Sequence, residues 1–171
     1  MGSAITPVAG DVATVTATIG VDPATAFEVF TTQIDQWWRR GPRFRNTSGD
    51  TGLMYLEPKV GGRLFESSRR PDGETVIEIG RVIEWSPPSR LVFKWRNSNF
   101  APDESTHVEI NFERCAAGTR VTVRHSGLSS LRADHPARHG LAPSAYVRMI
   151  GLWWGELLGA LIKSIHVIRR T

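Results

Sequence analysis

The segment PSAYVRMIGLWWGELLGALIKSIHVIR, residues 143–169, decides the fold of this chain. At about 100° per residue, its apolar side chains fill an arc of about half the circumference of a helix. They are Tyr146, Ile150, Trp153, Trp154, Leu157, Leu158, Leu161, Ile165 and Ile168. A helix on the surface of a domain usually has a narrower apolar stripe. The pattern therefore predicts one long helix that lies across a broad apolar surface, most simply the concave face of a sheet.

The chain before this helix consists mostly of short segments in which apolar and polar residues alternate. Residues 13–21 alternate apolar side chains with threonine, and Asp22-Pro23 predicts the start of a short helix. The alternation returns in six later segments, at about 53–57, 63–67, 74–85, 91–96, 106–113 and 120–124. Because the connections between these segments are short, the strands are expected to pair antiparallel.

This order of elements predicts an α+β fold. We expect a curved antiparallel sheet of about seven strands wrapped around the long C-terminal helix, with one or two short helices after the first strand. Residues 129–140 are expected to form a loop or a short helix. A bent sheet that grips an amphipathic helix leaves a space between the two layers, which is a typical position for a ligand pocket.

Size and composition limit the class of protein. With 171 residues and 40% hydrophobic side chains, the chain suits one soluble domain over residues 11–171, preceded by a flexible tail over residues 1–10. The single cysteine, Cys115, excludes an intramolecular disulfide and a multi-cysteine zinc site. Three glycines and Glu156 interrupt the longest apolar stretch, so no membrane span is expected. With no export signal at Met1, the expected location is the cytoplasm.

The charge is basic but not concentrated. The net charge is +4 and the pI about 9.8, and all of the 21 basic residues except Lys59, Lys94 and Lys163 are arginine. A basic protein can neutralise phosphates, but these arginines are scattered along the chain. We therefore expect no specific nucleic-acid partner.

Several pieces of the sequence, in this order, resemble the SRPBCC superfamily, also called START-like, which has the helix-grip fold. Within it the chain is similar to homologues of the activator of the heat-shock-protein-ninety ATPase. The pieces are VDP at 21–23 with AFEVF at 26–30, WW at 37–38, EPKVGGRLFE at 57–66, GRVIEW at 80–85, PPSRLVFKW at 87–95, GTRVTV at 118–123 and GLWW at 151–154. The resemblance covers residues 11–166 and implies the fold. It does not choose among the superfamily's lipid carriers, hormone receptors, polyketide cyclases, aromatases and co-chaperone domains.

The aromatic residues are the first candidates for a ligand site. Tryptophans in the predicted core elements can pack the core or line an apolar pocket. We expect Phe65, Ile79, Trp95, Phe112, Trp153 and Leu157 to form the walls of the pocket. Trp37 and Trp38, which follow a short helix and precede Gly41-Pro42, are expected near its mouth.

Two polar residues are candidates for orienting the ligand. Arg81 shares a strand face with Ile79, so strict alternation points it inward, where it would need a ligand carboxylate or Glu78 as a partner. Alternatively, Gly80 marks a bulge that reverses the face and puts Arg81 in water. His125, at the end of an alternating strand, is the second candidate.

No cofactor is expected. Asp134, His135 and His139 lie close in sequence, but Pro136 favours a flexible loop over a metal site. The glycine series at Gly151, Gly155 and Gly159 allows either close helix packing, as in a homodimer, or room for a ligand.

Three functions remain open. The first is binding of a small apolar molecule, aromatic or lipid-like, between the sheet and the C-terminal helix. The second is a cyclase or aromatase that uses the same pocket, in which His125 or Glu78 would move protons. The third, implied by the resemblance, is a chaperone-associated interaction module.

Overall fold

The computed structural model describes residues 11–47, 52–97, 99–168 and 170, so the predicted tail at residues 1–10 lies outside the described part. The elements in chain order are β1 (Ala13–Ile19), α1 (Pro23–Thr31), α2 (Ile34–Trp37), β2 (Gly52–Leu56), β3 (Arg63–Arg70), β4 (Gly73–Ser86), β5 (Arg90–Trp95), β6 (Thr106–Cys115), β7 (Gly118–Ser126), the 3₁₀ turns η1 (Leu128–Ser130) and η2 (Pro136–Arg138), and α3 (Pro143–Ile168).

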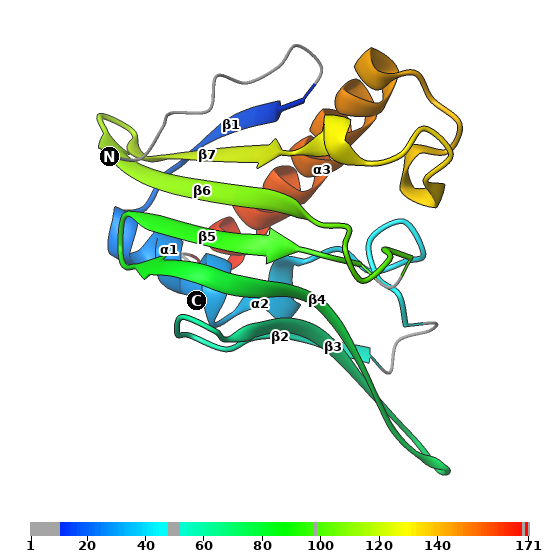
Figure 1. The fold of residues 1–171 in the computed structure, drawn as a ribbon. Helices are drawn as coiled ribbons and strands as arrows, with labels where there is room; N and C mark the ends of the chain where they lie inside the picture. Colours follow the sequence, from blue (N-terminus) through cyan, green and yellow to red (C-terminus); the bar gives the residue numbers. More distant parts are fainter. Residues whose placement is uncertain (1–10, 48–51, 98, 169, 171) are drawn as a thin grey trace.

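The strands form one curved antiparallel sheet, and α3 crosses its concave face (Figure 1). The strand order is β1-β7-β6-β5-β4-β3-β2, so β1 and β2 are the two edges. This arrangement is the helix-grip fold, and it confirms the α+β architecture that the alternating strands and the long helix predicted.

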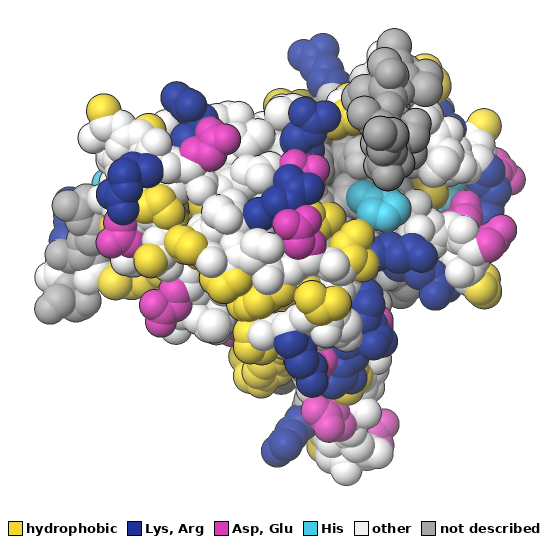
Figure 2. Space-filling model, turned by 60° about the vertical axis from the view of Figure 1, so that its left-hand side comes forward, with side chains coloured by type: hydrophobic (Ala, Val, Ile, Leu, Met, Phe, Trp, Pro, Cys, Tyr) yellow, Lys and Arg dark blue, Asp and Glu magenta, His cyan; other side chains and the backbone are white. Residues whose placement is uncertain are grey.

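Alternation along the strands separates an inner, apolar face from an outer, charged face. On β6, Val108, Ile110 and Phe112 are buried beneath the helices, while His107 and Glu109 point to the other side. Figure 2 shows that basic and acidic side chains adjoin one another over one face of the molecule. The core therefore lies between the sheet and the helices, and most of the charged side chains lie outside it.

Two irregularities in β4 change which side chains face inward. Leu64 pairs with Gly80 and Phe65 with Glu78, so Ile79 is left without a partner on β3. A second register shift follows beyond Val82. Each extra residue reverses the alternation.

The long helix α3 is the one described helix that is long and apolar enough to cross a membrane, judged by length and composition only. In the fold, Trp154, Leu157, Leu158, Leu161 and Ile165 are buried. Core helices of soluble proteins meet the same criterion, so this feature is weak support for a membrane span.

Candidate functional site

A pocket of about 400 Å³ lies between the sheet and the N-terminal half of α3, and we call it the inner pocket. Its lining comes from the loop after α2, the end of β5 and the segment after it, β7, η2 and α3. The lining residues are Pro42, Arg43, Asn46, Trp95, Asn97, Asn99, Phe100, His125, Ala137, His139, Tyr146, Met149, Ile150 and Trp153. A volume of this size is within the range of small-molecule sites.

His125 lies at the base of the inner pocket and is fully engaged by its neighbours. Its Nδ1 accepts a hydrogen bond from Trp154 Nε1 at 3.1 Å, because an indole N–H can only donate. The proton therefore resides on Nε2, which donates to Thr106 Oγ1 at 2.7 Å. Burial, with a smaller contribution from His107, lowers the pKa of His125 from 6.5 to about 3. His125 is thus a neutral imidazole throughout the physiological pH range.

The aromatic wall of the pocket is built from Trp95 and Trp153, whose ring centroids are 5.9 Å apart in an edge-to-face arrangement. Trp153 donates from Nε1 to the carbonyl oxygen of Arg43 at 2.7 Å, which ties α3 to the loop after α2. Trp38 lies behind both rings, stacked on Trp95 at 6.3 Å. The wall is therefore supported from behind and fixed in orientation.

Two buried charged residues hold the loop that forms the pocket lip. Arg45 donates to Asp35 Oδ1 at 2.6 Å and to the carbonyl oxygen of Trp38 at 2.7 Å. Glu66, a fully buried carboxylate on β3, accepts from the backbone N–H of Asn46 at 2.8 Å and from Thr47 Oγ1 at 3.1 Å. These bonds fix the course of residues 39–47 and so position Pro42, Arg43 and Asn46.

Three of the residues expected in the pocket lie elsewhere, and for Arg81 the reason is the bulge in β4. The side chain of Arg81 points outward, is half exposed and is paired with Glu78 at 2.7 Å. This is the outcome expected if Gly80 marks a bulge. Phe65, which pairs with Glu78 across the strands, also lies on the outer face, where it stacks on Tyr55 at 5.2 Å. Ile79 is buried in the core and does not line the pocket.

The other expected residues divide between the pocket and the core. Trp95, His125 and Trp153 line the inner pocket. Trp37 and Trp38 are buried rather than at the mouth, and their Nε1 atoms donate to the backbone carbonyls of Val29 and Phe44 respectively. Phe112 packs edge-to-face against Phe27 and Phe30 beneath α1, and Leu157 is fully buried. The pocket therefore occupies only one end of the space between the sheet and α3.

Several lining residues were not predicted. Tyr146 and Ile150 lie on the same arc of α3 as Trp153, so the helical spacing already contained the signal for them. Burial raises the pKa of Tyr146 to about 12, so its phenol stays neutral. Asn97, Asn99 and Phe100 come from an irregular segment, where no periodicity exists to indicate their direction. Within the described residues, no group of three or more His, Cys, Asp or Glu side chains could hold a metal ion.

Solved structures share this fold at low sequence identity. Protein SA2116 of unknown function from Staphylococcus aureus is 14% identical, with a TM-score of 0.67 over 94% of this chain and 96% of that one. Protein MLL2253 from Mesorhizobium loti is 18% identical, with a TM-score of 0.61 over 91% and 96%. DynU16, a putative protein in the dynemicin biosynthetic locus, is 20% identical, with a TM-score of 0.60 over 91% of this chain and 47% of that one. At such identities the likeness concerns the fold alone.

The sequence comparisons give the family. No curated protein sequence matches the chain. Residues 21–148, which include most of the sheet and the start of α3, match the family described as Activator of Hsp90 ATPase homolog 1-like protein. The chain therefore belongs to this family of the SRPBCC superfamily.

Proposed function

We propose that the chain binds a small, uncharged aromatic molecule in the inner pocket. The apolar part of the ligand would lie against Trp95 and Trp153, and its polar groups would face the rim. The carboxamides of Asn97 and Asn99 at the rim suit hydroxyl or carbonyl groups, because a carboxamide both donates and accepts hydrogen bonds.

The observation that carries this proposal is that, among the described lining residues, no charged side chain lies at the base of the inner pocket. His125 is neutral and Tyr146 is a neutral phenol. At the lip, Arg43 and Arg39 share the carboxylate of Glu156, at 3.2 and 2.9 Å, so the positive charge stays on the exposed rim and does not reach the base. A charged ligand would lose its hydration there without gaining a counter-charge, whereas an uncharged aromatic ring loses little.

The second candidate is an enzyme of the cyclase or aromatase kind. The superfamily has ligand-binding and polyketide cyclase-like members. Such an enzyme needs an acid–base group inside the pocket. Glu78 lies on the outer face, paired with Arg81, and both nitrogens of His125 are engaged. This candidate therefore rests on His139, which lines the rim in the left-handed backbone conformation with φ of 48°.

A titration with the neutral fluorophore N-phenyl-1-naphthylamine tests the first candidate. Ile150→Arg introduces a charge into the pocket and should abolish the fluorescence increase. Leu152→Arg is the matched control, because Leu152 lies on the same helix but is 62% exposed. Equal binding by both variants would exclude the inner pocket as the site.

Native mass spectrometry of the freshly purified protein complements the titration. An adduct that disappears on denaturation and is absent from Ile150→Arg would give the mass of the natural ligand. Turnover of a polyketone mimic that is lost in His139→Ala but kept in His125→Gln would instead favour the enzyme.

A further inference from the structure

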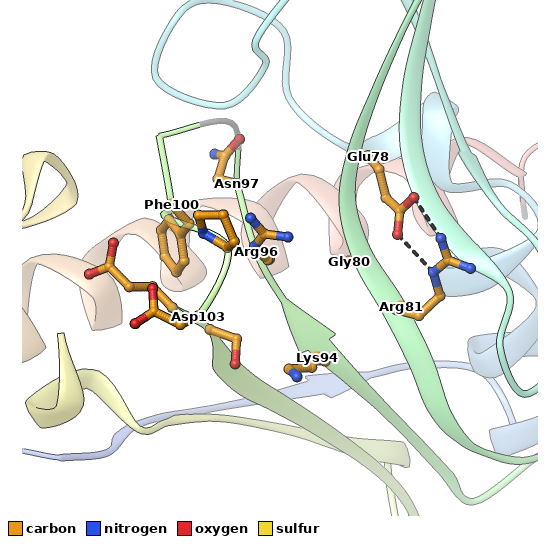
Figure 3. Close-up of a pocket in the computed structure, with 11 residues that line it drawn as sticks. Glu78, Gly80, Arg81, Lys94, Arg96, Asn97, Phe100 and Asp103 are labelled. Carbon is orange, nitrogen blue, oxygen red and sulfur yellow. Dashed lines mark hydrogen bonds and ion pairs between the residues drawn. The ribbon is translucent and has the colours of Figure 1, made fainter.

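A second pocket, which we call the outer pocket, lies on the opposite side of the sheet and has a volume of about 600 Å³. The segment that follows β5 separates the two, since Asn97 and Phe100 line both. Figure 3 shows the outer pocket with the Arg81–Glu78 pair of β4 on one side, Phe100 and Asp103 on the other, and Lys94 and Arg96 between them.

The sheet register lines up basic side chains beside this pocket. Arg81 of β4 pairs with Lys94 of β5, and Lys94 pairs in turn with His107 of β6. Arg96 follows Lys94 by two residues and therefore projects on the same side. Like charges placed directly opposite one another on neighbouring strands destabilise a sheet. The row is costly unless carboxylates or a bound anion neutralise it.

The neighbouring carboxylates compensate this row only in part. Glu78 is bound by Arg81 through two hydrogen bonds, at 2.7 and 2.8 Å. Glu104 accepts from Arg132 Nη1 at 2.9 Å and from the backbone N–H of Ala101 at 2.9 Å. Both carboxylates are thus engaged away from Lys94.

Three groups in the outer pocket keep their charge uncompensated within the described part of the chain. The side chain of Lys94 makes no hydrogen bond or ion pair with any described residue. The side chain of Arg96 makes one hydrogen bond among these residues, from Nε to the carbonyl oxygen of Ala101 at 3.3 Å. Among the described residues, the side chain of Asp103 has no hydrogen-bond or ion-pair partner either. The pocket therefore presents an ammonium group and the Nη atoms of a guanidinium on one side, and on the other the carboxylate of Asp103, since Glu78 and Glu104 are already engaged.

We propose that the outer pocket binds a small soluble molecule through an anionic group, a phosphate or a carboxylate, held by Lys94 and the Nη atoms of Arg96. Charge-assisted hydrogen bonds from ammonium and guanidinium groups are the usual means of holding such anions. The hydroxyl of Ser105, also in the lining, can donate a further hydrogen bond. Asp103 would repel the anion and so confine it to the side of Lys94. The site is separate from the inner pocket and does not depend on the proposed function.

Calorimetry and amide chemical-shift titration with phenyl phosphate test the proposal through effects of opposite sign. Lys94→Gln and Arg96→Gln should each weaken binding about tenfold, the loss expected for one charge-assisted contact. Asp103→Asn should strengthen binding, because it removes the repelling charge. Lys163→Gln is the matched control, since it removes the same charge from an exposed position on α3. All four side chains are exposed, so the variants should keep the fold, which circular dichroism checks.

Three results would overturn the proposal. The first is that phenyl phosphate causes no amide chemical-shift changes at the outer pocket of the wild-type protein. The second is that Lys163→Gln weakens binding as much as Lys94→Gln, which would mean general charge attraction. The third is binding to phosphatidylglycerol vesicles without binding to phenyl phosphate, which would assign the cations to a lipid headgroup instead of a soluble anion.

Discussion

The buried neutral state of His125 should make the stability of the fold depend on pH. Burial lowers the pKa of His125 in the folded protein to about 3, well below the 6.5 of an unburied histidine. As the pH falls below 6.5, the unfolded chain takes up a proton that the folded protein cannot accept, so stability is lost. Between pH 7 and pH 5 this one residue should lower the unfolding free energy by about 2 kcal/mol.

Urea unfolding of wild type and His125→Gln, followed by tryptophan fluorescence at pH 5, 6, 7 and 8, measures this contribution. Glutamine can still accept from Trp154 Nε1 and donate to Thr106 Oγ1, so the comparison isolates the titration from the loss of hydrogen bonds. Carboxylates whose pKa is lowered by folding, such as Glu109, change the stability mainly below pH 5, outside the range compared here. Wild type should lose about 2 kcal/mol more than the variant from pH 7 to pH 5. Equal losses would mean that His125 titrates normally in the folded protein, and the reasoning would be refuted.

Three further outcomes are expected. Gly118→Ala should destabilise the protein by at least about 2 kcal/mol more than Gly41→Ala in urea unfolding, because both glycines have positive φ but only at Gly118 would a Cβ overlap the carbonyl oxygen of Ile19. Arg45→Gln should lower the unfolding free energy by about 3–5 kcal/mol, because it removes a buried partner of Asp35. Arg40→Gln removes a half-exposed partner of the same Asp35 and should cost less than about 1 kcal/mol. Similar costs for the two variants would contradict the role given to Arg45. Phe65→Thr should leave the affinity for N-phenyl-1-naphthylamine unchanged, since Phe65 lies on the outer face, and a weaker affinity would contradict that placement.

The fold could be predicted because its signals are periodic. The long apolar arc of residues 143–168 and the alternation in residues 106–113 each specify an element and the face that it buries. Asp22-Pro23 starts α1 as expected, with the carboxylate of Asp22 accepting from the backbone N–H of Thr25 at 2.7 Å. Short connections then leave antiparallel pairing as the simple solution.

The residues that line the site could be predicted only in part. The prediction was wrong where the sequence has no regular periodicity, at a bulge and in an irregular loop. The bulge at Ile79 places Arg81 in solvent, and only Gly80 hinted at it. The burial of Trp37 and Trp38 depends on the path of an irregular loop, which is held by Arg45 and Glu66. A carboxylate at an inward position of β3 was a visible sign of such an anchor, but its partners lie about 20 residues away in sequence.

The ion pairs of the described residues show how this basic protein offsets many of its positive charges. Among the described residues, every ion pair that the structure contains uses an arginine, apart from the contact of His135 with Glu104. The planar guanidinium suits these pairs because it can bridge two carboxylates, as Arg90 does between Glu84 and Glu109. Lys94 departs from this pattern, since its cross-strand neighbours are Arg81 and His107 rather than carboxylates. Because the ammonium group of Lys94 lies between two basic residues and has no carboxylate opposite it, an anion bound there would relieve the repulsion between them.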